Sequence, residues 1–175
     1  NIKFVKKILG IVVLGLLLSG NAYAATEKNY LICEDTVKEN FSKGAIKGEY
    51  PIGEVINTEY LELIKKKTKA TLKVTRHWPG LYLWQSSKAE KQGTLKGSLK
   101  DNDYIFNHSF SNNGKDHKEN YKLYKIDNSW NIDGYLKWDG FMNEYVEFKF
   151  ISKCKEYEKK EFINLRKLAM KKPKY

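Results

Sequence analysis

The feature that most constrains the fold is a two-residue alternation of apolar and polar side chains through the second half of the chain. Leu95, Gly97 and Leu99 alternate with Lys96 and Ser98. Because successive side chains of a strand point to opposite faces of a sheet, this period indicates half-buried strands. In three later segments the residues of one parity are likewise mostly large and apolar: Tyr104, Phe106, His108 and Phe110; Trp130, Ile132, Gly134, Leu136 and Trp138; Val146, Phe148, Phe150 and Cys154.

Clusters of turn-forming residues separate these segments. Asn, Asp, Ser and Gly gather at residues 100–103, 112–114, 127–129 and 138–140, and they tolerate the backbone angles of tight turns. Short strands joined by such turns are typical of an antiparallel meander.

The end of the chain changes period. From residue 155 on, apolar positions that include Phe162, Leu165 and Ala169 recur at spacings of three and four, which is one face of a helix. This helix is basic and could lie on a membrane, but its narrow apolar face without Trp favours docking onto the sheet. Residues 171–175 are expected to form a frayed basic tail.

Together these patterns predict one mainly β domain (all-β or α+β) over residues 25–170. The expected architecture is an antiparallel meander that forms a small barrel or a two-sheet sandwich, with a C-terminal helix. We favour the barrel, because pairing of the first element with the last would close the sheet.

The first half of the chain is less regular. Thr36 followed by Glu39 has the spacing of a capping box and predicts one or two helical turns up to Phe41. Residues 55–64 fit either a helix or a strand. Strands are expected at residues 68–75 and 81–85 and around residues 30–33, with a turn at residues 77–80.

Residues 1–24 have the pattern of a secretory signal peptide. A basic start precedes an apolar run at residues 8–18, which is shorter than the about 20 residues that span a bilayer. Small residues then predict cleavage between Ala24 and Ala25. Asn21 stands where a lipoprotein would carry its lipid-bearing Cys. We therefore expect a bacterial protein that is exported to the periplasm or secreted, with no transmembrane segment in the mature chain.

The only two cysteines, Cys33 and Cys154, stand near opposite ends of the expected domain. In an exported chain two cysteines are expected to pair. Closing so long a loop stabilises a fold by about 4–5 kcal/mol in the chain-entropy model.

The net charge of +11 comes almost entirely from lysine, because only Arg76 and Arg166 among the 32 basic residues are arginine. Specific recognition of nucleic acid usually relies on the planar fork of Arg, so a nucleic-acid partner is disfavoured. The charge reflects either composition bias, which we favour, or peripheral contact with anionic surfaces.

The histidines and carboxylates of the sequence form no recognisable catalytic or metal-binding motif. His77, His108 and His117 lack the short spacing of zinc ligands, and no metal or cofactor is expected. His108 shares the parity of the apolar residues around it, which predicts a core or pocket position. Neighbouring carboxylates such as Glu34 and Asp35 suggest surface turns, and would become acid–base candidates only in a cleft with perturbed pKa values.

Aromatic residues are the best candidates for a binding site. They could line a cavity for an apolar or carbohydrate ligand, although such residues more often fill the core of a small β domain. We therefore expect a non-enzymatic binding protein for a small ligand, an envelope polymer or a protein. The alternatives are an enzyme of unknown type and an interaction module whose partner covers a sheet edge. The candidate ligand-binding residues are Trp78, Tyr82, Trp84, Tyr104, His108, Trp130 and Trp138.

Overall fold

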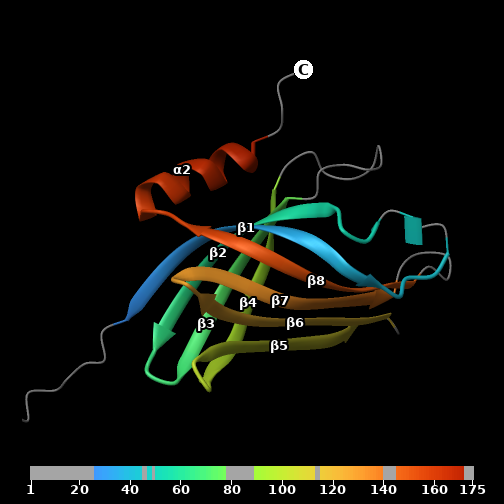
Figure 1. Ribbon diagram of the computed structural model, residues 1–175, viewed down its shortest axis with the longest axis horizontal. Coiled ribbons are helices and arrows are strands. Elements are labelled where there is room, and N and C mark those ends of the chain that lie inside the picture. The colour runs from blue at the N-terminus through green and yellow to red at the C-terminus, as the bar shows by residue number, and fades with distance from the viewer. Residues whose placement is uncertain are drawn as a thin grey trace, which may run out of the picture.

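The computed structural model describes residues 26–44, 47–48, 50–77, 89–112, 115–139 and 145–171. Within these residues the chain is mainly β, with a short C-terminal helix, as the alternation predicted (Figure 1). The elements are β1 (Glu27–Asn40), β2 (Val55–Lys66), β3 (Lys69–His77), β4 (Glu90–Lys100), β5 (Asp103–Asn112), β6 (Lys115–Ile126), β7 (Ser129–Asp139), β8 (Tyr145–Glu156) and α2 (Lys159–Ala169).

The strands form a closed antiparallel barrel in which each strand pairs with the next one along the chain and β1 pairs back onto β8. The preference for a barrel over a sandwich is therefore confirmed. Cys33 lies directly opposite Cys154 across the β1–β8 junction, and a disulfide joins them with a Cα–Cα distance of 4.1 Å. The predicted disulfide thus sits in the junction that closes the ring.

Two of the predicted turns are two-residue hairpin loops. Asp101 and Asn102 have φ angles of 50° and 71°, and Asp127 and Asn128 have φ angles of 48° and 64°. Positive φ at both central residues is the geometry that matches the right-handed twist of paired strands. Asn and Asp reach it at low cost, which explains their place in these loops.

In the first half, residues 55–64 belong to β2 and are strand, not helix. The expected helical turns after Thr36 are wrong, because β1 continues to Asn40 and pairs with β8 over this stretch. A capping box stabilises a helix by only about 1 kcal/mol, which a ladder of backbone hydrogen bonds outweighs. The strand expected at residues 81–85 lies outside the described residues.

Glycines at two inward positions leave room for aromatic rings. A Cβ atom on Gly134 would lie 2.0 Å from Cζ of Phe150, and one on Gly97 would lie 2.5 Å from Cδ1 of Phe106. Both rings are buried. Phe150 of β8 and Phe106 of β5 therefore each pack over a neighbouring strand at a position that has no side chain.

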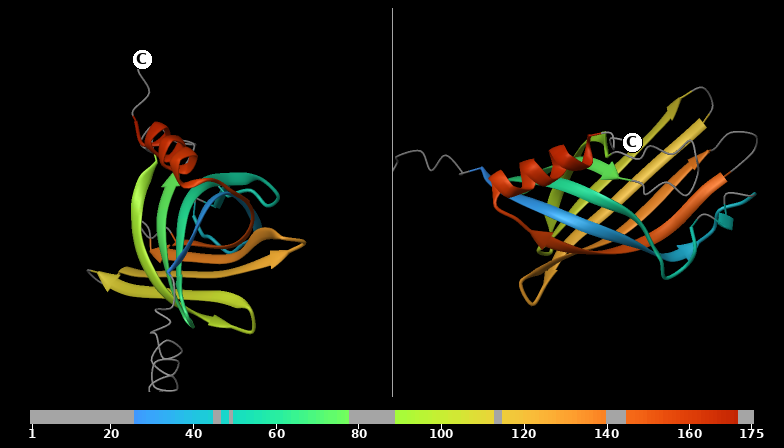
Figure 2. Two further views of the ribbon diagram at one scale, coloured as in Figure 1. Left: turned by 90° about the vertical axis from the view of Figure 1, so that its left-hand side faces the viewer. Right: turned by 90° about the horizontal axis from the view of Figure 1, so that it is seen from above.

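Helix α2 docks onto the outside of the barrel, as the narrow apolar face predicted. Phe162 is fully buried, and its ring centroid lies 5.3 Å from that of Tyr30 on β1 and 6.4 Å from that of Tyr60 on β2. The backbone nitrogen of Ala89 donates a hydrogen bond to the carbonyl oxygen of Ala169. Contacts near both ends thus hold the helix, which lies along the outside of the barrel (Figure 2).

The ring of strands is uneven. β4 and β5 are joined by only four register pairs, from Gly97 opposite Phe106 to Lys100 opposite Asp103. Beyond Phe106, β5 pairs with β6 alone among the described residues. Figure 2 shows the β5–β6 hairpin extending away from β4 on this side. Residues 107–112 of β5 therefore form a strand edge that no described residue pairs with on the side of β4.

Candidate functional site

A cluster of polar side chains lies inside the barrel, where a small β domain ordinarily places apolar residues. It sits between an apolar layer at the end with the two-residue turns and a second apolar layer, around Val37, Leu136 and Phe148, at the opposite end. All members are at most 5% exposed. The cluster consists of Asp35, Asn57, Glu59, Arg76, Glu119, Tyr121 and Ser152.

Strand register brings these residues together. Glu59 of β2 stands opposite Arg76 of β3, and Asp35 of β1 stands opposite Asn57 on one side and Ser152 on the other. Directly opposite residues of an antiparallel pair have their Cβ atoms about 5 Å apart on the same face. The same alternation that predicts the strands therefore turns all these polar side chains inward.

Arg76 is the centre of the first half of the cluster. Its Nε donates to Oε1 of Glu59 at 2.7 Å, and its Nη2 bonds Oε1 of Glu119 and the hydroxyl of Tyr121. The Tyr121 hydroxyl in turn lies 2.7 Å from Oε1 of Glu59 and 2.8 Å from Oε1 of Glu119. The guanidinium fork thus links two carboxylates from different walls of the barrel.

Asp35 is the centre of the second half. The hydroxyl of Ser152 donates to its Oδ1. Its Oδ2, the Oε2 of Glu59 and both polar atoms of the Asn57 side chain are buried without a hydrogen-bond partner in the described part of the chain. The Asn57 amide is close enough to lower the pKa of Asp35, but it makes no hydrogen bond of good geometry.

The environment moves the carboxyl pKa values apart. Burial, followed by the nearby charge of Glu59, raises the pKa of Asp35 well above its ordinary value. Burial also raises the pKa of Glu59, although Arg76 opposes the shift. Burial would raise the pKa of Glu119 as well, but hydrogen bonds from His117, Arg76 and Tyr121 and the charge of Arg76 lower it to about 2.

Such a cluster is costly to fold. Each buried polar atom left without a partner costs about 1–3 kcal/mol, and native proteins leave few of them. Titratable groups with shifted pKa values gather at functional sites more often than elsewhere. The interior cluster is therefore the strongest candidate site in the described residues.

The predicted aromatic residues fall into three groups. Tyr104 and Trp130 pack together at the turn end of the barrel, with ring centroids 6.1 Å apart. Trp138 lies at the opposite end, edge-on to Tyr50 at 6.2 Å. Trp78, Tyr82 and Trp84 lie outside the described residues. The described tryptophans thus contribute to the apolar layers above and below the cluster.

His108 is exposed, which corrects its expected position in the core. Its parity is inward, but it lies on the part of β5 that extends past the last pair with β4. Its ring packs on Phe110 at 5.4 Å, and Phe110 stacks on His117 at 4.8 Å. His117 lies 3.9 Å from Glu119, so a row of rings connects the surface with the cluster.

Sequence reasoning missed most of the cluster. Its pairing with Glu34 in the sequence suggests a surface turn for Asp35, yet Asp35 is fully buried. Two signals could have found the site. Asn57 and Glu59 occupy the parity that Leu61 and Leu63 continue, and Arg76 is one of only two arginines in a lysine-rich chain.

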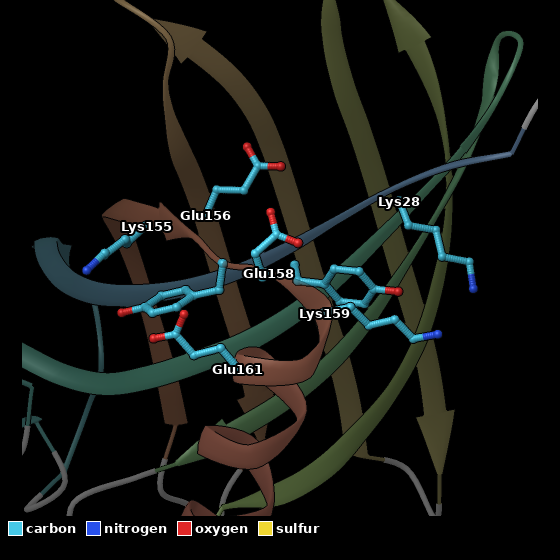
Figure 3. Close-up of a pocket in the computed structure, with 8 residues that line it drawn as sticks. Lys28, Lys155, Glu156, Glu158, Lys159 and Glu161 are labelled. Atoms are coloured by element: carbon cyan, nitrogen blue, oxygen red, sulfur yellow. The ribbon is translucent and has the colours of Figure 1, made fainter.

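A pocket on the outer surface is a weaker candidate site than the interior cluster. A pocket of about 430 Å³ opens beside α2, and Figure 3 shows Lys28 and Lys155 at opposite sides of it. Three lysines and three glutamates line it, so it selects neither charge. Its lining residues are Lys28, Tyr30, Lys155, Glu156, Tyr157, Glu158, Lys159 and Glu161.

Several surface lysines of the barrel lie over aromatic rings. Lys118 lies 5.6 Å from the ring centroid of Tyr135, and Lys137 lies 5.2 Å from that of Tyr145. This gives the outer face of β6–β8 a basic and aromatic character. Contact with an anionic surface stays a prediction.

Within the described ranges, no group of three or more His, Cys, Asp or Glu side chains has an arrangement that could hold a metal ion. Nor does this part of the chain contain a helix with the length and apolarity needed to cross a bilayer. The chain matches no protein-family model, no curated protein and no solved structure.

Proposed function

We propose that the protein is an exported, non-enzymatic binding protein that holds a small ligand inside the barrel, against the buried cluster. One observation carries this proposal: Asp35, Asn57 and Glu59 keep four polar atoms without partners among the described residues. An eight-stranded barrel is just wide enough either to be filled by side chains or to hold one small ligand. Unsatisfied polar atoms at its centre favour the second use.

Export rests on two features that agree with each other. Residues 1–24 have the pattern of a cleaved leader, and the Cys33–Cys154 disulfide suits an oxidising compartment. N-terminal sequencing of the protein from culture medium or periplasm should begin at Ala25. An intact leader on cytoplasmic protein would contradict this part of the proposal.

A binding role suits the cluster better than catalysis. Glu59 and Glu119 have pKa values shifted in opposite directions, as an acid–base pair requires. Both carboxylates, however, are bound by Arg76 and Tyr121, and neither is more than 5% exposed. A substrate would have to displace these contacts before any proton could move.

The test is to purify the full chain natively, denature it, and identify released small molecules by mass spectrometry. We expect roughly one ligand per barrel. Asn57→Leu removes two unpartnered polar atoms and keeps the same branched side-chain shape, so this variant should be more stable than the wild type and should release no ligand. The absence of any released compound, together with no thermal stabilisation by a metabolite extract, would contradict the proposal.

A second candidate function is recognition of an extended peptide segment, favoured by the strand edge at residues 107–112. This edge is unpaired on the side of β4 among the described residues, and such edges can accept a further strand. Hydrogen exchange in the presence of a partner extract should then slow at these residues. Unchanged exchange would leave only the interior site.

A further inference from the structure

Three neighbouring side chains in the cluster carry buried polar atoms that have no hydrogen-bond partner in the described part of the chain. Asp35 and Asn57 are register partners on β1 and β2, and Glu59 follows Asn57 on the same face of β2. All three are fully buried. Among the residues that the structure describes, no hydrogen-bond partner is found for Oδ2 of Asp35, Oδ1 and Nδ2 of Asn57, and Oε2 of Glu59.

These atoms are mainly hydrogen-bond acceptors. Two are carboxylate oxygens and one is an amide oxygen, against a single amide nitrogen that donates. A group that completes the cluster must therefore bring hydrogen-bond donors. A primary ammonium has three N–H donors and no acceptor, which equals the number of open acceptors.

The charges of the cluster point the same way. It holds three carboxyl groups, Asp35, Glu59 and Glu119, and one guanidinium. Arg76 bonds the Oε1 atoms of the two glutamates and the hydroxyl of Tyr121, whereas Oδ2 of Asp35 has no hydrogen-bond partner in the described part of the chain. An ion of opposite charge beside two like charges favours their ionised form, so a second cation would relieve the repulsion between Asp35 and Glu59.

We propose that the ligand carries a primary ammonium group, bound between Oδ2 of Asp35, Oδ1 of Asn57 and Oε2 of Glu59. This assignment rests on the proposed small-ligand function and specifies the chemistry of that ligand. The Asn57 amide nitrogen remains free to donate to an acceptor elsewhere on the same ligand. Tyr121 and Phe150, whose rings meet edge-on at 5.8 Å, line the same interior beside the site.

The experiment is titration calorimetry of the mature, disulfide-bonded protein with four matched probes at equal ionic strength. The probes are n-propylammonium, 1-propanol, propionate and tetramethylammonium. We expect binding of n-propylammonium and at least tenfold weaker binding of the other three. Propanol lacks the charge, propionate has the wrong charge, and tetramethylammonium lacks the donors.

Asp35→Asn should weaken n-propylammonium binding by roughly 10- to 100-fold, as expected for loss of a charge-assisted hydrogen bond. Glu34→Gln is the matched control, because Glu34 is the neighbour of Asp35 on β1 but is exposed on the outer face. This control should bind like the wild type. Thermal unfolding of each variant verifies that it is folded, and Asn57→Ala provides a second test at a different acceptor.

Failure of this inference can be told from failure of the proposed function. If n-propylammonium does not bind, if propanol binds as tightly, or if Asp35→Asn binds like the wild type, the ammonium assignment is overturned. A natively released ligand without an amine would also overturn it, while the small-ligand function would stand. Only the absence of any released or stabilising compound would remove both.

Discussion

Arg76 of β3 and Glu59 of β2 face each other across adjacent strands and are joined by a 2.7 Å hydrogen bond, and both side chains are buried. The same guanidinium reaches Glu119 on β6, a strand that does not neighbour β3 in the ring. Arg76 therefore ties together walls of the barrel that share no backbone hydrogen bonds.

Replacing Arg76 should be strongly destabilising. Arg76→Leu leaves Glu59 and Glu119 buried without their cation, and removal of one partner from a buried ion pair costs about 3–5 kcal/mol. Arg76→Lys should cost less, because the charge is kept and only the fork is lost. Denaturant unfolding measures both. Arg166→Lys on the surface helix is the control, and its free energy of unfolding should change by less than about 1 kcal/mol. A fully stable Arg76→Leu protein would contradict this account.

Asp35→Asn should give a stability gain that depends on pH. The pKa of Asp35 in the folded protein is raised above its ordinary value of 3.8. Ionisation of Asp35 is therefore less favourable in the folded than in the unfolded state, and it lowers the stability of the wild type. Below pH 3.8 the wild type and the variant should be similarly stable. The advantage of the variant should grow as the pH rises above that value, until the folded-state pKa is passed.

Thermal unfolding of the ligand-free proteins across this pH range checks the sign. Glu34→Gln serves again as the control, with a difference from the wild type that does not grow with pH. A gain for Asp35→Asn that is constant, or that shrinks at higher pH, would refute the assignment of a raised pKa.

Gly134→Ala should destabilise the barrel by about 1–3 kcal/mol, because a Cβ atom would overlap the ring of Phe150. Gly48→Ala is the matched control, since a Cβ atom there would meet nothing within 4 Å. In a double-mutant cycle, Phe150→Leu should recover part of the loss at Gly134. Strict additivity of the two substitutions would argue against the overlap.

Phe162→Ala should release α2 from the barrel at a cost of about 3–5 kcal/mol. Leu168→Ala on the same helix should have little effect, because Leu168 is 63% exposed. Limited proteolysis should then cleave within α2 in the first variant only. Equal resistance of the two variants would show that the Phe162 contacts do not hold the helix.

The meander, the barrel closure, the disulfide and the helix could be predicted from sequence, because each depends on local periodicity or on residue type. The pattern around Trp130, Ile132 and Gly134 specifies which face is buried, and strand pairing follows from short turns. The error at Thr36 arose where a local helix signal competed with pairing to β8, a contact that lies far along the chain.

The interior cluster could not be predicted in the same way. Asp35, Glu59 and Glu119 are far apart in sequence, and only the register of the closed ring places them together. A β-bulge shifts the alternation of inward and outward positions by one residue. The sequence spacing alone therefore does not tell whether a carboxylate points into the barrel or out of it. The predicted burial of His108 failed for a similar reason. β4 and β5 separate after Phe106, so the inward parity of His108 does not bury it.

The junction between β4 and β5 has a further consequence for motion. Four register pairs hold this joint, whereas the joint between β1 and β8 is covalently locked by Cys33–Cys154. Local opening needs the least free energy where the fewest contacts break. Fluctuations that admit an occupant to the interior should therefore begin at the β4–β5 hairpin, while the disulfide-bonded wall keeps its register.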